Sequence, residues 1–100
     1  MKLQMHSIHF DADIKLLDFI QKRMDKLETF YDRIIDGEVF LKVENGTKFN
    51  NKVVELKVNI PGQTLFSKEQ NSSFEAATDA GVEALRRQIR KYKEKQQVHN

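Results

Sequence analysis

The chain has 100 residues, of which 17 are Lys or Arg and 15 are Asp or Glu, so its formal net charge is +2. With 39% hydrophobic and 32% charged residues, it can bury one thin core beneath a densely charged surface. The absence of Cys excludes disulfides, thiolate metal sites and thiol catalysis, and suits a reducing compartment. No apolar run approaches the roughly 18 residues of a membrane span or the roughly 7–15 of a signal peptide, so we expect a cytoplasmic protein.

The chain shows no internal repeat, no low-complexity tract and no linker. We therefore expect a single domain over residues 1–100, in which residues 96–100 form a frayed tail.

The N-terminal half predicts a strand, a helix and a second strand. Apolar residues alternate over 2–9, with a phase break near Ser7. Asp13 is a suitable N-cap for a helix over 14–28, where apolar residues recur every three or four positions. The alternation over 39–43 predicts the next strand.

The C-terminal half predicts two more strands and a second helix. Apolar residues alternate over 54–60, and a turn at Pro61-Gly62 leads to a fourth strand over 65–70. Ser72 or Ser73 can cap the final helix, whose apolar positions again advance by threes and fours.

The predicted order is thus β-α-β-β-β-α, an α+β fold in two layers with a four-stranded sheet. Each helix has one apolar stripe and the sheet has one apolar face. Such elements close a core only when both helices pack on the same face of the sheet.

Basic residues are concentrated on the two helices. Between Arg86 and Lys95 there are six basic residues and a single acid, Glu94, and on a helical wheel the basic arc lies opposite the core. In the first helix a basic stripe runs along one flank, and the acidic residues Asp18, Asp25 and Glu28 occupy the other. The stripe and the arc can combine into one surface suited to RNA phosphates. The candidate rRNA-binding residues are Lys15, Lys22, Arg23, Lys26, Arg86, Arg87, Arg90, Lys91, Lys93 and Lys95.

An alternative interpretation of this charge stays open. Lys and Arg are also favoured near helix C-termini by the macrodipole, and surface charge keeps a helix soluble.

Aromatic residues offer fewer candidates for RNA contact. Phe19 lies within the basic stripe, and we expect it to be exposed and able to stack on a base. Most other Phe residues of a thin domain belong to its core. We expect Tyr92 to seal the edge of the core and Asp79 to pair with Arg or Lys or to bond nearby backbone.

The sequence contains no convincing catalytic, metal or cofactor site. His6 and His9 are three positions apart on a predicted strand, so they face opposite sides and cannot share a metal. Ser7, His9 and Asp11 are too close along the chain to build a triad. The four Gly residues are isolated, which excludes a glycine-rich phosphate loop. We expect a protein that is not an enzyme and uses no cofactor.

The helical runs over 12–27 and 73–93 resemble the ribosome hibernation promoting factor and ribosome-associated inhibitor family, also called the sigma-54 modulation protein family. The second run carries the most specific part of the resemblance, namely Ala76-Ala77, Asp79, Leu85, Gln88 and Lys91-Tyr92-Lys93. Thr78 departs from it, since the family usually has an aliphatic residue there.

The resemblance implies a small domain that binds the small ribosomal subunit and its rRNA between head and body. It would cover the tRNA and messenger sites and repress translation in nutrient stress or stationary phase. Long members carry an extra C-terminal domain that pairs ribosomes, and this chain resembles the short form. We therefore expect a monomer when free, no membrane partner, and pairing of ribosomes only with a separate dimerisation factor.

Two alternatives remain at this point. The exposed hairpin or the acidic flank of the first helix could bind a protein such as a sigma factor. The chain could also be a free double-stranded RNA binder, a class that shares the α-β-β-β-α order without the first strand.

Overall fold

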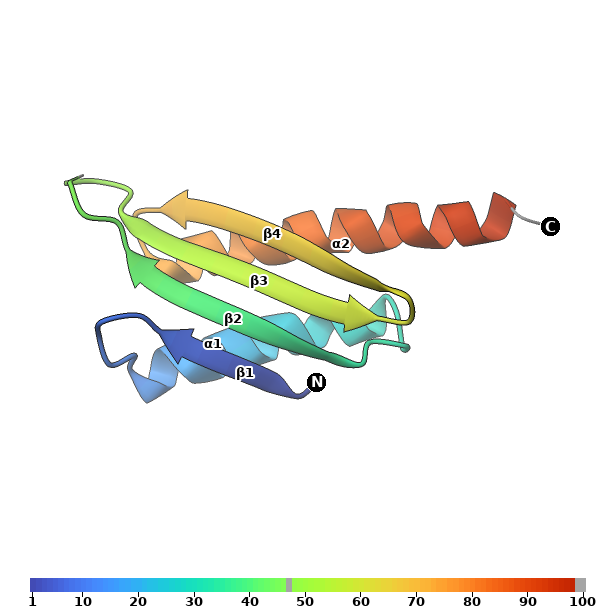
Figure 1. Cartoon of the computed structure of the whole chain (residues 1–100), viewed down its shortest axis with the longest axis horizontal. Coiled ribbons are helices and arrows are strands. Elements are labelled where there is room, and N and C mark those ends of the chain that lie inside the picture. The colour runs from blue at the N-terminus through green and yellow to red at the C-terminus, as the bar shows by residue number, and fades with distance from the viewer. Residues whose placement is uncertain (47, 99–100) are drawn as a thin grey trace.

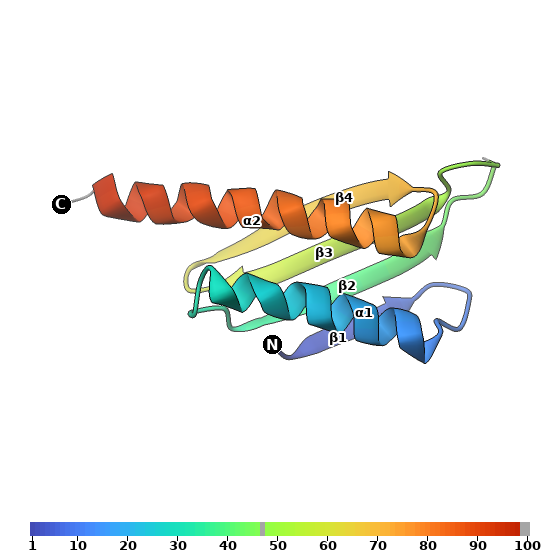
Figure 2. The same cartoon turned by 180° about the vertical axis from the view of Figure 1, so that it is seen from behind.

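In the computed structural model, which describes residues 1–46 and 48–98, four strands form one sheet and two helices cover one of its faces (Figure 1). The view from behind shows the two helices side by side and running in the same direction (Figure 2). The elements are β1 (Leu3–Ser7), α1 (Ile14–Asp25), a 3-10 helix η1 (Lys26–Thr29), β2 (Asp36–Val43), β3 (Lys52–Ile60), β4 (Gln63–Asn71) and α2 (Phe74–Val98). The predicted β-α-β-β-β-α order in two layers is confirmed.

The strands lie in the sheet in their chain order, β1-β2-β3-β4. β1 pairs with β2 in parallel because α1 intervenes between them, and the other two pairs are antiparallel. The predicted turn joins β3 to β4, and Gly62 adopts φ +81° there, a conformation that favours glycine.

The three later strands are longer than the sequence predicted. β2 begins at Asp36, β3 at Lys52 and β4 at Gln63. Pairing in a hairpin propagates into polar residues whose side chains are in solvent, so hydrophobic alternation does not reveal these ends. In contrast, β1 ends at Ser7, where the sequence indicates a phase break, and His9 follows with φ 66°.

Side-chain caps fix where the helices begin. The Asp13 carboxylate accepts a hydrogen bond from the backbone N–H of Lys15 (3.1 Å), as predicted. Of the two serines considered for the second helix, Ser73 provides the cap, since its hydroxyl accepts from the N–H of Ala76 (3.0 Å). The predicted helix over 14–28 is α-helical only to Asp25 and then tightens into η1.

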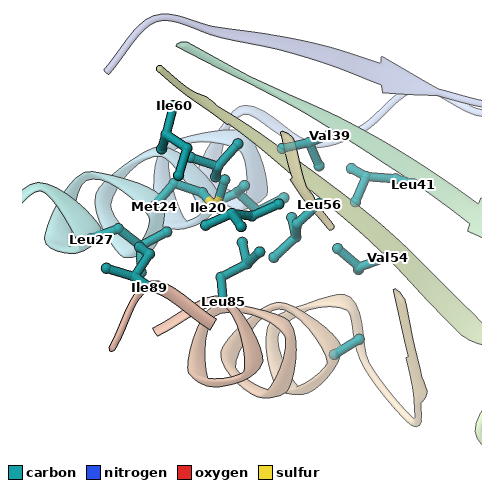
Figure 3. Packing of buried hydrophobic residues seen from close by; sticks show 13 residues of the cluster. Ile20, Met24, Leu27, Val39, Leu41, Val54, Leu56, Ile60, Leu85 and Ile89 are labelled. Atoms are coloured by element: carbon teal, nitrogen blue, oxygen red, sulfur yellow. The ribbon is translucent and has the colours of Figure 1, made fainter. Parts of the chain in front are cut away.

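The core lies between the sheet and the two helices (Figure 3). Alternate residues of β3 point into it, and the apolar stripes of α1 and α2 cover them, as expected from the periodicity. The buried cluster comprises Ile20, Met24, Leu27, Val39, Leu41, Val54, Leu56, Val58, Ile60, Leu65, Ala77, Leu85 and Ile89.

The N-terminal half of α2 packs very closely on the sheet. A Cβ atom at Gly81 would lie 2.8 Å from Leu56 Cδ1, and the Ser67 hydroxyl donates to the Gly81 carbonyl (3.0 Å). Thr78 is fully buried one turn earlier, and its hydroxyl has no hydrogen-bond partner within residues 1–46 and 48–98. The residue that departs from the family pattern is therefore a core residue with an unpaired polar atom.

The C-terminal turns of α2 project past the end of the sheet (Figures 1 and 2). Of the predicted frayed tail, residues 96–98 belong to α2, and residues 99–100 lie outside the described part of the chain. Within that described part, no helix is long and apolar enough to cross a membrane.

Candidate nucleic-acid interface

The charges of α1 are divided between its two flanks, as the sequence predicted. Lys15, Lys22 and Lys26 are exposed, and Arg23 is half-buried on the side toward α2. On the opposite flank, the ammonium of Met1 contacts Asp25 (2.5 Å) and Glu28 (2.8 Å). The acidic flank therefore belongs to the packing of the N-terminus and leaves the basic stripe facing outward.

The basic arc of α2 is divided by the structure into two groups. Arg86, Arg90 and Lys93 lie toward the end of α1, where they line a pocket with Phe30. Lys91 and Lys95 line a different pocket, beside β4. Arg87 lies on the outer surface, and its side chain is 57% exposed. Lys91 and Lys95 therefore lie on the flank of α2 beside β4, whereas Arg86, Arg90 and Lys93 lie toward Phe30.

An ion pair links the two helices. Arg23 Nε donates to Asp79 Oδ1 at 2.8 Å, and both side chains are partly exposed. This confirms the expected structural role of Asp79. The contact links the basic stripe of α1 to α2.

Glu83 is an acidic residue next to the basic arc that the sequence did not single out. Its carboxylate accepts two hydrogen bonds from Arg86, from Nη2 at 2.6 Å and from Nε at 3.0 Å, and Arg87 Nη1 lies 3.8 Å away. The hydrogen bonds from Arg86 lower the pKa of Glu83, which stays ionised at neutral pH. The spacing of three and four residues was visible in the sequence and could have identified these pairs.

Phe19 is not the exposed aromatic residue that the sequence predicted. Its ring is half-buried against the core, and the Arg23 guanidinium carbon lies 4.3 Å from the ring centroid. Phe19 packs against the core beneath Arg23, which amphipathic spacing alone did not reveal. The exposed Phe side chains in the described residues are Phe30 (43%), Phe49 (82%) and Phe66 (42%).

Tyr92 closes the edge of the core as expected. Its ring meets Tyr31 edge to face, with centroids 5.8 Å apart, and its hydroxyl lies 3.5 Å from the Pro61 carbonyl oxygen. The partly buried ring packs against the core cluster.

The two histidines considered as metal ligands lie apart from this surface. His6 Nε2 lies 2.7 Å from the Glu38 carboxylate, and its ring stacks on Phe40. His9 follows the end of β1 in the left-handed region. Within residues 1–46 and 48–98, no group of three or more metal-ligating side chains is assembled.

We call the remaining set the helical basic surface, which consists of Lys15, Lys22, Arg23, Lys26, Arg86, Arg87, Arg90 and Lys93. These side chains come from α1, η1 and α2, which pack side by side in the helical layer. Their ammonium and guanidinium groups can neutralise closely spaced phosphates.

Comparisons with known proteins agree with this architecture. The family described as "Sigma 54 modulation protein / S30EA ribosomal protein" matches residues 3–97. The ribosome hibernation promoting factor of Pseudomonas putida is 32% identical over 97 residues, which cover 97% of this chain and 91% of that protein. The factor of the same name from Klebsiella oxytoca is 27% identical over 99 residues, covering 99% and 100%.

A solved structure supports the fold independently. The ribosomal subunit interface protein from Coxiella burnetii superimposes with a TM-score of 0.81 at 22% identity, covering 93% of this chain and 98% of that one. At this identity the likeness concerns the fold. The family match over almost the whole chain establishes that this protein belongs to the sigma 54 modulation protein / S30EA ribosomal protein family.

Proposed function

We propose that the protein is a ribosome hibernation factor, which binds the small ribosomal subunit and represses translation under stress or in stationary phase. Its family membership carries this proposal, together with relatives named ribosome hibernation promoting factor. The family consists of ribosome-associated factors rather than enzymes. The protein would act in the cytoplasm.

The helical basic surface supplies the physical basis for binding rRNA. Its exposed lysines on α1 and its arginines on α2 come from neighbouring helices of the same layer (Figure 2), whereas Asp25 and Glu28 on the acidic flank of α1 contact Met1. Each contact with a phosphate releases counterions, so binding through this surface must weaken steeply as salt increases.

The proposed mechanism is occupancy. The domain measures 50 × 23 × 19 Å, and its long axis includes the projecting end of α2. A body of this size on the decoding region would exclude tRNA and messenger without chemical change to the RNA. Translation in a cell-free system should therefore fall while rRNA stays intact. Fragments of rRNA that accumulate in step with inhibition would contradict the mechanism.

Co-sedimentation with small ribosomal subunits at several salt concentrations tests the proposed surface. The double variant Lys22→Gln/Arg90→Gln should bind more weakly and should show a shallower salt dependence, by about 0.7–0.9 log unit per lost phosphate contact. A matched control, Lys57→Gln/Lys68→Gln, removes the same charge from strands β3 and β4 and should bind like wild type. Equal losses in both variants would show that net charge, rather than this surface, determines binding.

The family description also includes modulation of sigma 54, which favours a protein partner as the second candidate. Sedimentation of a cell extract distinguishes the candidates. A protein-binding regulator or a free double-stranded RNA binder would remain above the ribosomal fractions, whereas a hibernation factor would migrate with them.

A further inference from the structure

A pocket of about 260 Å³ opens where the end of η1 meets the C-terminal half of α2. It combines an aromatic ring with several charged groups, and its lining consists of Phe30, Arg86, Ile89, Arg90, Lys93 and Glu94. Ile89 is part of the core, so the pocket reaches from the surface to the apolar interior. Phosphate binding alone would not require such an apolar floor.

Phe30 is held in place by backbone contacts on both sides. It follows η1 directly, where its N–H donates to the Leu27 carbonyl (3.0 Å). Its own carbonyl accepts from Lys93 Nζ (2.8 Å), which ties this corner to α2. The side chain is nevertheless 43% exposed, and the Arg86 guanidinium carbon lies 5.5 Å from the ring centroid. The backbone of Phe30 is therefore fixed, and the residue remains open to solvent beside Arg86.

The cations beside the ring differ in how strongly they are engaged. Arg86 is held by Glu83. Among the described residues, neither Arg90 nor Lys93 forms an ion pair, and Lys93 keeps two further ammonium hydrogens after its bond to the Phe30 carbonyl. Glu94 is the acid among the lining residues. Arg90 and Lys93 can therefore bind an anion within reach of the Phe30 ring.

We propose that this pocket receives one unstacked nucleotide of the RNA that the helical basic surface binds. The base would stack on Phe30, and its phosphate would contact Arg90 and Lys93. This inference rests on the proposed function and specifies one site within that interface. Aromatic rings and arginine planes are the groups on which splayed bases of single-stranded RNA stack. The volume is just below the range of roughly 300–1,000 Å³ for drug-sized ligands, which suits one base with its sugar.

Phe30→Leu is the decisive substitution because it keeps an apolar side chain and removes the π face. Stacking predicts that affinity for small ribosomal subunits falls by about 5- to 150-fold, while the salt slope stays unchanged. Phe30→Tyr should restore wild-type binding, and both variants should melt like wild type because the residue is partly exposed. Arg90→Gln should instead reduce the salt slope by about 0.7–0.9.

Two simple polyanions separate stacking from charge. Oligoadenylate offers bases and phosphates, whereas inorganic polyphosphate offers phosphates alone. Phe30→Leu should weaken binding of oligoadenylate and leave binding of polyphosphate unchanged. Equal weakening for both polymers would overturn the inference, since Phe30 would then act only by positioning the neighbouring cations.

The outcomes also separate this inference from the proposed function. If wild type binds ribosomes and Phe30→Leu binds equally well, the pocket proposal is wrong and the hibernation role stands. If wild type fails to bind ribosomes, the hibernation role is wrong, and the oligoadenylate comparison still decides whether the pocket accepts a base.

Discussion

Replacing Glu83 with Gln should make the protein bind RNA more tightly, because Glu83 neutralises two arginines of the helical basic surface. Its carboxylate receives a bidentate pair of hydrogen bonds from Arg86, at 2.6 and 3.0 Å, and lies 3.8 Å from Arg87. Gln has nearly the same shape, but it carries no charge, and its amide group replaces one acceptor oxygen with a donor NH2. The substitution therefore frees the guanidinium groups without removing the side chain that supports them.

The size of the effect follows from counterion release. Each guanidinium that gains a phosphate steepens the dependence of log affinity on log salt by about 0.7–0.9. If both arginines are freed, the slope of the variant should exceed that of wild type by about 1.4–1.8. Between about 50 and 200 mM salt, the affinity advantage of the variant then shrinks by about 7- to 12-fold. The stability cost should be small, because solvent screens an exposed ion pair.

Co-sedimentation with small ribosomal subunits, repeated across this salt range, measures the slope directly. Glu75→Gln is the matched control, since it removes an exposed acid from the first turn of the same helix. It should leave the slope unchanged. If Glu83→Gln binds more weakly than wild type, or with an unchanged slope, Glu83 orients the arginines toward phosphate rather than competing with it, and the reasoning is wrong.

Three predictions concern the fold and can be measured by urea or thermal unfolding. Thr78→Val should stabilise the protein by about 1 kcal/mol. The substitution keeps the side-chain shape and removes a buried hydroxyl that has no partner among the described residues. A loss of stability would show that the hydroxyl is satisfied. Gly81→Ala should destabilise the protein by about 1–3 kcal/mol, because the new Cβ would lie 2.8 Å from Leu56 Cδ1. This clash should outweigh the higher helix propensity of Ala. A gain in stability would mean that Leu56 can move aside. The hydrogen bonds from Arg86 lower the pKa of Glu83 in the folded protein. The Glu83–Arg86 ion pair therefore stabilises the fold at pH values above 4.5, the ordinary pKa of Glu, and this stabilisation is lost as pH falls through the lowered pKa of the folded state. The difference in stability between wild type and Glu83→Gln should therefore shrink on acidification.

Periodicity and caps predicted the fold because they are local features with direct consequences for packing. Asp13 begins α1, and alternating apolar residues in β3 define the face that both helices cover. The strand ends and the close approach at Gly81 were not predictable, since both depend on partners distant in the sequence.

The sequence predicts which basic residues the two helices carry but not how the fold arranges them. A helical wheel places all six cations of α2 on one arc, yet the neighbouring elements decide which of them share a surface. Arg90 and Lys93 lie at the corner after η1, whereas Lys91 lies beside β4. The exposed ring of Phe30 was missed for the same reason, because a residue beyond a helix end has no periodic face that predicts its exposure.

The two acids of α2 that bind arginine should affect the surface in different ways, although each removes one negative charge when substituted by its amide. The Glu83 pairs lie within one helix, so their loss changes charge and leaves the backbone in place. The Asp79 pair spans α1 and α2, so its loss also releases Arg23 from the position that covers Phe19. Asp79→Asn should therefore steepen the salt slope as a freed arginine does, but it should also lower the melting temperature more than Glu83→Gln. Equal melting temperatures would show that core packing alone fixes the two helices, and that Asp79 serves only to moderate the charge of the surface.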